Sequence, residues 1–356
     1  MIADFLLAGT MIANFLLAGQ SNIDEWFHAN DGAALEAFEA EFLALNPQFT
    51  SVIFYDAARG GSAILSISAL ATADLRDDPG TDLHNKIASN YWYDAENQSG
   101  GPTFDLFDDR ITEWVEADVT FEGIIWAQGE ASTIYVRPEN AAEYQEGLDF
   151  VLTALQQLAE TENVYIQALG DRLVYSETLH AGTQTIRQVQ MDIANHNPNI
   201  QVVTTIFDLD LRDSVHLTAE AYVEAAERMA VAISTGEVSP TLDHAVLTEN
   251  GDIIIQLKLA EDQRLNENGT VLGFSVTDDG IDVPIQNMNI YPNGVIVLTF
   301  ETPPANPIVS YGDPDVTIHM TATDYLTAVG ALATLPIQPF STVAPTISGQ
   351  ITATHE

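Results

Sequence analysis

The stretch MIANFLLAGQSN, residues 11–22, decides the fold. Its apolar run at 12–18 predicts a buried β-strand. The strand is expected to stop at Gly19, because the polar residues 20–22 follow directly. Ser21 therefore lies between the end of a strand and the start of the next helix. We interpret the rest of the chain in relation to this serine.

Residues 1–10, MIADFLLAGT, repeat residues 11–20 almost perfectly, but only the second copy runs on into Ser21 and Asn22. We therefore interpret residues 1–10 as a duplicated apolar segment without a site. Whether Met11 is the natural start, with the first copy a duplication or a cloning scar, stays open at this point.

Strands and helices are expected to alternate after this first strand. Short apolar runs that suit strands lie at 12–18, 51–55, 121–127, 163–169 and 200–207. Amphipathic stretches that suit helices lie at about 32–45, 139–160, 182–195 and 218–233. This alternation predicts a parallel sheet covered on both faces, with the site at the carboxyl ends of the strands.

The character of the chain changes at about residue 237. Ser239-Pro240 is typical of a linker, and β-rich runs follow it. These runs lie at 252–259, 270–277, 295–300 and 316–321. Asn-Gly or Asp-Gly pairs, which favour hairpin turns, separate them at 250–251, 268–269, 279–280 and 293–294. We predict a catalytic α/β domain over 1–236 and an antiparallel β-sandwich domain over 237–356.

The chain is strongly acidic, with 52 Asp and Glu against 11 Lys and Arg and a formal net charge of −41. Such a surface repels nucleic-acid phosphates and anionic lipid, so neither is an expected partner. It also repels itself, and added salt screens that repulsion. A marine or salt-loving source is favoured over an ordinary acidic bacterial protein.

Localisation is left open between the cytoplasm and export without a signal peptide. The amino terminus lacks a basic region, because the first arginine is Arg59, and no apolar run is long enough to span a bilayer. The chain has no cysteine, which excludes disulfides and thiolate chemistry.

Two motifs supply a nucleophile and its base. Ser21 follows a strand end, and a serine hydroxyl becomes a nucleophile when a base removes its proton. Asp213 and His216, three residues apart before the helix at 218–233, can lie side by side so that the carboxylate orients the imidazole. Taken singly, Ser21 can equally be a helix cap, and an isolated Asp-x-x-His more often marks a helix start.

Two further motifs can bind an oxyanion. Gly60-Gly61 after the second strand lets backbone N–H groups approach it, although a lone Gly-Gly is more often a tight turn. Gln128 after the third strand can donate an amide hydrogen bond, or can be a plain polar residue at a strand end. All four motifs follow strands of one α/β pattern, which is far less expected by chance than any of them alone.

With these motifs the chain resembles the SGNH hydrolases. Within them it is similar to the carbohydrate esterases grouped with sialate O-acetylesterases and acetylxylan esterases, carbohydrate esterase family 6 and its relatives. The matching residues are GQSN at 19–22, GGS at 60–62, WAQGE at 126–130, IRQVQ at 186–190 and DSVHLT at 213–218. The resemblance covers residues 12–235 and implies a flavodoxin-like three-layer α/β/α sandwich.

The resemblance implies that Ser21 is the nucleophile, His216 the general base and Asp213 the residue that orients it. It implies an oxyanion hole of the Ser21 and Gly61 backbone N–H groups and the Gln128 side-chain amide. The supporting residues are Gly60, Gln20, Asn22, Glu130 and Arg187. Glu130 is expected to brace its loop. Arg187 pairs with a carboxylate beneath the site, or is a surface helix charge.

The implied activity is removal of O-acetyl groups from a carbohydrate through an acyl-enzyme, without a metal or organic cofactor. The alternatives are a lipase-like or aryl esterase on the same scaffold and a non-catalytic glycan-binding or structural protein. The substrate partner is an acetylated glycan or a small ester, and the oligomeric state stays open. Family members usually act on exported glycans, whereas this chain shows no signal peptide, and the repeated first strand also departs from the family pattern.

Other residues favour plainer interpretations. The remaining histidines have no metal-ligand spacing. Asp278-Asp279 and 313–315 can bind calcium through loop carboxylates, but acidic turns are expected in so acidic a chain. The aromatic residues 91–93 can stack on a sugar ring or anchor a buried loop.

Overall fold

The computed structural model describes residues 11–170, 177–266, 273–312, 327–329, 334–337 and 340–344. Residues 1–10, the run at 316–321, the Asn-Gly pair at 268–269 and the acidic turn at 313–315 lie outside these ranges.

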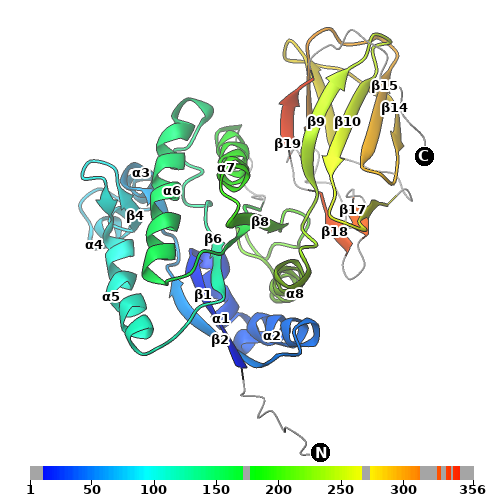
Figure 1. The fold of residues 1–356 in the computed structure, drawn as a ribbon. Helices are drawn as coiled ribbons and strands as arrows, with labels where there is room; N and C mark the ends of the chain where they lie inside the picture. Colours follow the sequence, from blue (N-terminus) through cyan, green and yellow to red (C-terminus); the bar gives the residue numbers. More distant parts are fainter. Residues whose placement is uncertain are drawn as a thin grey trace, which may run out of the picture.

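Five parallel strands form the central sheet in the order β2-β1-β6-β7-β8 (Figure 1). They span β1 Met11–Gly19, β2 Phe49–Ala58, β6 Gly123–Ala127, β7 Val164–Ala168 and β8 Ile200–Thr205. Every pairing in this sheet is parallel. The order reverses between β1 and β6, and in such sheets ligands bind at the carboxyl ends on either side of that point. The predicted flavodoxin-like sheet is confirmed.

Helices cover both faces of the sheet. On one face lie α5 Pro102–Glu116, α6 Ala141–Leu158 and α7 Glu177–His196. On the other lie α1 Ser21–His28, α2 Ala33–Leu45 and α8 Ala219–Thr235. The molecule therefore has the three layers that the alternating pattern predicts. Within the described ranges, no helix is long and apolar enough to cross a bilayer.

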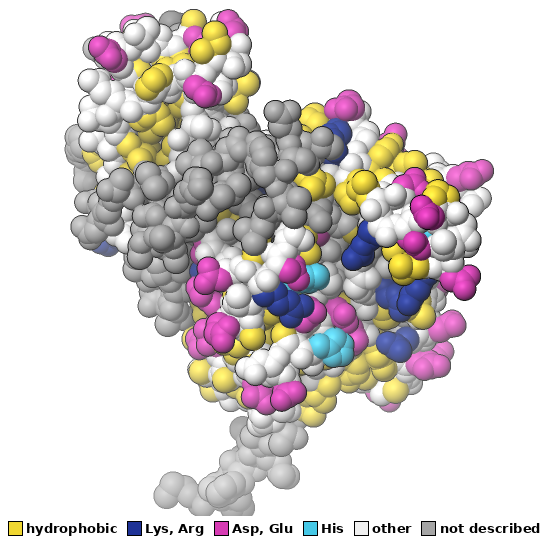
Figure 2. Space-filling view, turned by 180° about the vertical axis from the view of Figure 1, so that it is seen from behind, with side chains coloured by type: hydrophobic (Ala, Val, Ile, Leu, Met, Phe, Trp, Pro, Cys, Tyr) yellow, Lys and Arg dark blue, Asp and Glu magenta, His cyan; other side chains and the backbone are white. Residues whose placement is uncertain are grey.

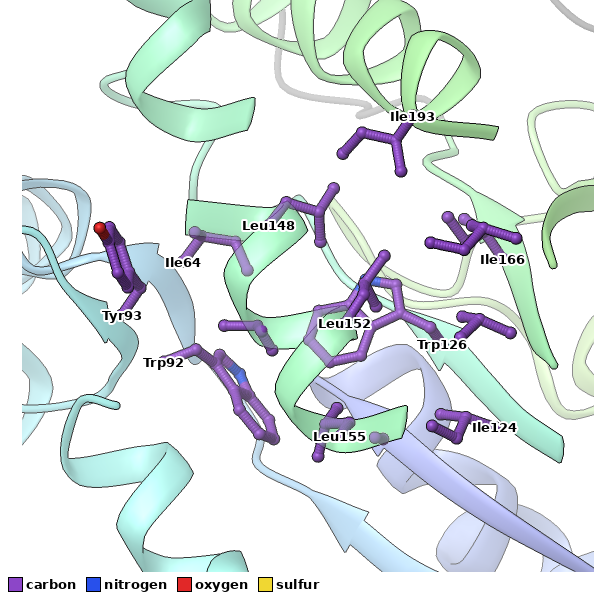
Figure 3. Packing of buried hydrophobic residues seen from close by; sticks show 14 of the residues in the cluster. Ile64, Trp92, Tyr93, Ile124, Trp126, Leu148, Leu152, Leu155, Ile166 and Ile193 are labelled. Carbon is purple, nitrogen blue, oxygen red and sulfur yellow. The ribbon is translucent and has the colours of Figure 1, made fainter. Parts of the chain in front are cut away.

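Strand β1 feeds both cores because successive side chains of a strand point to opposite faces. Leu16 and Ala18 belong to the cluster under α5–α7, whereas Phe15 and Leu17 belong to the cluster under α1, α2 and α8. Burial on both sides explains why the run is continuously apolar rather than alternating. Figure 3 shows the first cluster, in which leucines of α6 pack over Trp126 and isoleucines of the sheet.

The segment between β2 and β6 holds elements for which no prediction was made. They are β3 Ala63–Leu65, α3 Ser66–Arg76, α4 Asp82–Ala88, β4 Tyr91–Asp94, β5 Ser99–Gly100 and the helix α5. For α5 the signal was present, since Phe104, Phe107 and Ile111 fall on one helical face and are buried. The short 3₁₀ helices η1 Ala29–Gly32 and η2 Pro138–Asn140 complete the α/β part.

The carboxy-terminal part consists of antiparallel sheets, as predicted. One has the order β14-β15-β10-β9, another β13-β12-β16-β19, and a smaller one β11-β17-β18. The first comprises β9 Thr241–Leu247, β10 Ile253–Lys258, β14 Ile285–Ile290 and β15 Val295–Phe300. The second comprises β12 Phe274–Asp278, β13 Ile281–Asp282, β16 Pro307–Tyr311 and β19 Phe340–Val343. The third comprises β11 Arg264–Leu265, β17 Thr327–Val329 and β18 Thr334–Pro336.

Residues of the first two sheets share one apolar core, so they form a β-sandwich. The predicted hairpin turns are present at Gly251, Asp279-Gly280 and Gly294, all with positive φ.

The two parts meet through a buried connection. Helix α8 ends at Thr235 and is capped by Gly236, whose φ is +76°. Ser239 is fully buried although a linker was expected there. Phe207, in the loop after β8, joins the sandwich core and packs edge-on against Tyr311, with ring centroids 6.1 Å apart. The division into separate domains at 236/237 stays a prediction.

The end of β1 requires glycine at position 19. Its φ is +128°, and a β-carbon there would lie 2.1 Å from the Ala127 carbonyl oxygen. We expect Gly19→Ala to lower the free energy of unfolding by more than about 3 kcal/mol. The alanine would hold a strained φ angle, and the backbone at Ala127 would also have to move away from the new β-carbon. Gly80→Ala is the matched control, since Gly80 has φ +90° with open space around it; it should cost about 1 kcal/mol. Denaturant titration measures both, and equal losses would contradict the packing argument.

Candidate active site

Ser21 lies at the carboxyl end of β1, as the first residue of α1. Two backbone hydrogen bonds fix this corner: Gln20 N–H donates to Ala127 O at 2.8 Å, and Arg59 N–H donates to Gly19 O at 3.0 Å. The corner is thereby tied to both neighbouring strands, β6 and β2. The first N–H groups of a helix lack acceptors within the helix, so this corner presents donors beside the serine hydroxyl.

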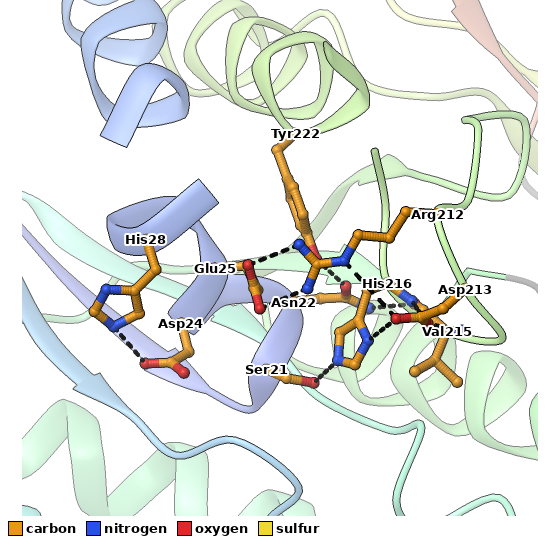
Figure 4. Close-up of polar contacts among 10 residues, drawn as sticks. All are labelled: Ser21, Asn22, Asp24, Glu25, His28, Arg212, Asp213, Val215, His216 and Tyr222. Carbon is orange, nitrogen blue, oxygen red and sulfur yellow. Dashed lines mark hydrogen bonds and ion pairs between the residues drawn. The ribbon is translucent and has the colours of Figure 1, made fainter. Parts of the chain in front are cut away.

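The structure brings Ser21, His216 and Asp213 into one line of hydrogen bonds (Figure 4). His216 Nε2 lies 3.0 Å from Ser21 Oγ, and His216 Nδ1 lies 2.8 Å from Asp213 Oδ2. These distances join residues 195 positions apart in the chain. The arrangement is that of a nucleophile, a general base and a carboxylate that sets the imidazole tautomer.

Asp213 remains ionised over the whole range in which histidine titrates. Partial burial raises the pKa of its carboxyl, but backbone N–H groups of Val215 and His216, each 2.9 Å from Oδ1, and the His216 ring together lower that pKa to about 2. The Asp-x-x-His spacing therefore serves two purposes. It places the ring against one carboxylate oxygen while the other oxygen closes the loop that carries the ring.

The glycine turn after β2 lies against the serine. A β-carbon built on Gly60 would be 4.0 Å from the Ser21 β-carbon, an ordinary contact distance, and Gly61 has φ +71°, a conformation that favours glycine. Ser62 anchors the turn from below: its hydroxyl donates to Gly19 O at 3.2 Å and accepts from Trp92 Nε1 at 2.8 Å. The turn is thus held beside the serine, and the binding of an oxyanion by its backbone N–H groups stays a prediction.

Gln128 lies at the end of β6 with its side chain 2% exposed. Its amide donates to Ser62 O at 3.1 Å and to Ser132 Oγ at 3.2 Å, and its Oε1 accepts from the Tyr144 hydroxyl at 3.0 Å. Both amide hydrogens are thus engaged within the protein. The structure places Gln128 beneath the glycine turn and does not bring it to the Ser21 hydroxyl, so its role as an oxyanion donor stays a prediction.

The residues on either side of Ser21 are buried and hold other segments. Gln20 Oε1 accepts from the N–H groups of Gly129 and Ala131, each at 3.2 Å. Asn22 Nδ2 donates to Glu130 and, at 3.1 Å, to Val215 O. Glu130 thus contacts α1 through Asn22, and its function as a brace for the loop stays a prediction.

Arg187 lies on α7. It is 4% exposed, which rules out a surface helix charge, and its Nε donates to Leu169 O at 2.7 Å just beyond β7. It therefore helps to close the end of a neighbouring strand.

Sequence reasoning missed three residues around the triad. Arg212 makes two hydrogen bonds to the Glu25 carboxylate, at 2.7 and 3.1 Å, and its Nε lies 3.8 Å from Asp213 Oδ2. Tyr222 donates to Asn22 Oδ1 at 2.8 Å, and burial raises the pKa of this phenol, so it stays a donor. The signal for Arg212 was its position next to Asp213; Glu25 and Tyr222 lie on helices where nothing marks them.

Three of the other residues singled out in the sequence, Trp92, Tyr93 and Asp278, are held by contacts within the protein. Trp92 and Tyr93 are buried at 0% and 2% exposure, so they anchor the loop rather than offer a face to a sugar. Asp278 accepts from the N–H groups of Ala305 and Asn306, each at 2.8 Å. Among the described residues no group of three or more His, Asp or Glu side chains could hold a metal ion.

Residues 86–235 match the model of a family described as "Carbohydrate esterase, sialic acid-specific acetylesterase". This stretch includes Gln128, Asp213 and His216 but begins after Ser21 and the glycine turn. No curated protein sequence matches the chain.

Among solved structures, a carbohydrate acetylesterase from Xanthomonas citri matches with TM-score 0.63 and 17% identity over 93% of this chain and 80% of that one. A carbohydrate acetylesterase from Sinorhizobium meliloti matches with TM-score 0.37 and 12% identity over 62% of this chain and 98% of that one. At these identities the first likeness shows the shared fold, and the second carries no argument. The predicted resemblance is confirmed: this chain resembles the sialic acid-specific acetylesterase family of carbohydrate esterases, which it matches over residues 86–235, on an SGNH-hydrolase fold.

Proposed function

We propose that this protein is a serine esterase that removes O-acetyl groups from a carbohydrate through an acyl-enzyme. The observation that carries the proposal is the line Ser21–His216–Asp213, with contacts of 3.0 and 2.8 Å, at the carboxyl edge of the sheet. The match to a carbohydrate esterase family over residues 86–235 supports the choice of an acetylated sugar as substrate.

In this mechanism Ser21 Oγ attacks the acetyl carbonyl carbon while His216 Nε2 takes the hydroxyl proton. Asp213 keeps the other imidazole proton on Nδ1 and stabilises the imidazolium that forms. The oxyanion is bound by backbone N–H groups of Ser21 and Gly61. His216 then gives its proton to the departing sugar oxygen, and a water molecule repeats the sequence to release acetate.

The first test concerns the nucleophile. Ser21→Ala should lower kcat for acetyl esters by about 10⁴-fold or more, because the acyl-enzyme cannot form. A phosphonate ester probe should label the wild-type protein on Ser21 and leave the variant unlabelled. Circular dichroism checks that the variant folds. Labelling elsewhere, or a variant that keeps a tenth of the rate, would overturn the assignment.

A substrate panel in the same assay separates the rival esterases. Acetate release from acetylated sugars is expected to exceed hydrolysis of long-chain acyl esters, which a lipase-like enzyme would prefer, and of plain aryl acetates.

The second test uses the ionisation of Asp213. Because its pKa is held at about 2, the carboxylate is charged throughout the working range, and the acid limb of kcat/KM reports a different group. In Asp213→Asn the negative charge beside the ring is gone, which disfavours protonated His216. The acid limb should therefore move to lower pH while kcat falls by about 10⁴-fold. Asp210→Asn, an exposed neighbour on the same loop, is the control and should leave the profile unchanged. An unmoved acid limb in Asp213→Asn would contradict the role.

The third test asks whether Gln128 lends a hydrogen bond to the oxyanion. If it does, Gln128→Ala should lower kcat by about 100- to 1000-fold with little change in KM. Ser132→Ala is the matched variant, because it removes one acceptor of the same amide and leaves the donor in place. It should keep kcat near the wild-type value. Equal losses of kcat and of melting temperature in both variants would make Gln128 a support for the Ser62 turn only.

A further inference from the structure

A pocket of about 680 Å³ opens beside the glycine turn on the side of α3, α4 and α5. Gly60 and Gly61 form part of its wall, and the wall reaches Ser21, since a β-carbon on Gly60 would be 4.0 Å from the Ser21 β-carbon. The charged residues that line it are Arg59, Arg76, Lys86, Arg110, Asp24 and Asp56.

The positive charge of this pocket contrasts with the rest of the chain. The whole protein has 11 Lys and Arg against 52 Asp and Glu, yet four of these cations line one pocket with two carboxylates. Figure 2 shows several Lys and Arg side chains on one side of the α/β part, with Asp and Glu side chains among and around them.

These four cations are also free to bind an anion, because they form no ion pairs within the described part of the protein. Elsewhere Arg212, Arg228 and Lys258 have carboxylates at 2.7, 2.7 and 3.9 Å. In the described part of the chain, no carboxylate lies within 4.0 Å of the charged nitrogens of the four cations in the pocket. All four are exposed, and Arg110 is held in place by a 3.3 Å hydrogen bond to Asp56 O and by the Phe107 ring. Four cations against two carboxylates, Asp24 and Asp56, leave the lining with an excess of positive charge, which favours binding of an anion.

We propose that this pocket binds a negatively charged group, a carboxylate or a sulfate, on the alcohol portion of the ester substrate. The inference rests on the proposed function. With the ester group at Ser21, the anionic sugar would extend along Gly60 toward Arg76 and Lys86. Arginine suits such groups because its guanidinium donates two parallel hydrogen bonds to one oxyanion group. Arg59 and Arg76 precede the family-matched residues 86–235, so the match does not account for the pocket.

The substrates that test this differ only in charge: O-acetylated glucose and O-acetylated glucuronate with the acetyl group on the same hydroxyl. Wild-type protein at low salt should show a higher kcat/KM on the glucuronate ester. The double variant Arg76→Gln/Lys86→Gln should lower the glucuronate-to-glucose ratio of kcat/KM by about tenfold or more, and about half-molar salt should reduce the wild-type ratio in the same direction. An O-acetylated galactose 6-sulfate distinguishes sulfate from carboxylate as the preferred group.

The matched control removes two exposed cations of the carboxy-terminal sheets, Lys258→Gln/Arg264→Gln. It changes net charge equally and should leave the ratio unchanged. A ratio that falls as much in the control, or that stays constant in the pocket variant, overturns the pocket while acetate release from glucose ester still upholds the proposed function. If the wild-type protein hydrolyses neither ester, both the pocket proposal and the proposed function are overturned.

Discussion

The side chain of Asn22 is the contact on which the geometry of the candidate site depends. It is 1% exposed and lies one residue after Ser21. Its amide donates to Glu130 in the loop after β6 and to the carbonyl of Val215, next to His216, while its oxygen accepts from Tyr222 on α8. Three segments from distant parts of the sequence are thereby positioned against the same turn of α1, so the distance between Ser21 and His216 is set by buried hydrogen bonds whose loss would leave polar groups unpaired.

The α/β pattern was predictable because both faces of the sheet are covered, which makes each strand a continuous apolar run such as 12–18. Ser21, Asp213 and His216 were predictable for a related reason: parallel strands bring residues that follow them to one edge. The helices between β2 and β6 were missed where they are short and polar, as α4 is, although α5 had a readable apolar face. Hydrogen-bond partners other than those of Ser21, His216 and Asp213 were not predictable. The sequence does not show that the Gln128 amide donates to Ser62 and Ser132. Nor does it show that Arg212 donates to Glu25. Those contacts depend on backbone positions set by packing.

The buried polar residues around the site share one purpose, which is to connect loops rather than to contact a substrate. Gln20 holds the loop after β6, Ser62 holds the glycine turn, and Gln190 Nε2 donates to Gln128 O at 3.0 Å from α7. Such a network resists displacement because each member satisfies another in a region of low dielectric constant. The exposed part of the site is correspondingly small, and it is limited to the serine, the histidine loop and the glycine turn.

The concentration of cations in one pocket of an otherwise acidic protein has a consequence for ionic strength. At 0.15 M salt charges are screened beyond about 8 Å, so added salt weakens repulsion among the carboxylates and stabilises the fold. The same ions compete for Arg76, Lys86 and their neighbours, and weaken attraction for an anionic ester. If the pocket binds an anionic ester as proposed, folding and substrate binding are expected to respond to salt in opposite senses. Turnover of a dilute anionic ester would then have a maximum at an intermediate salinity that neither the folding curve nor the binding curve shows alone.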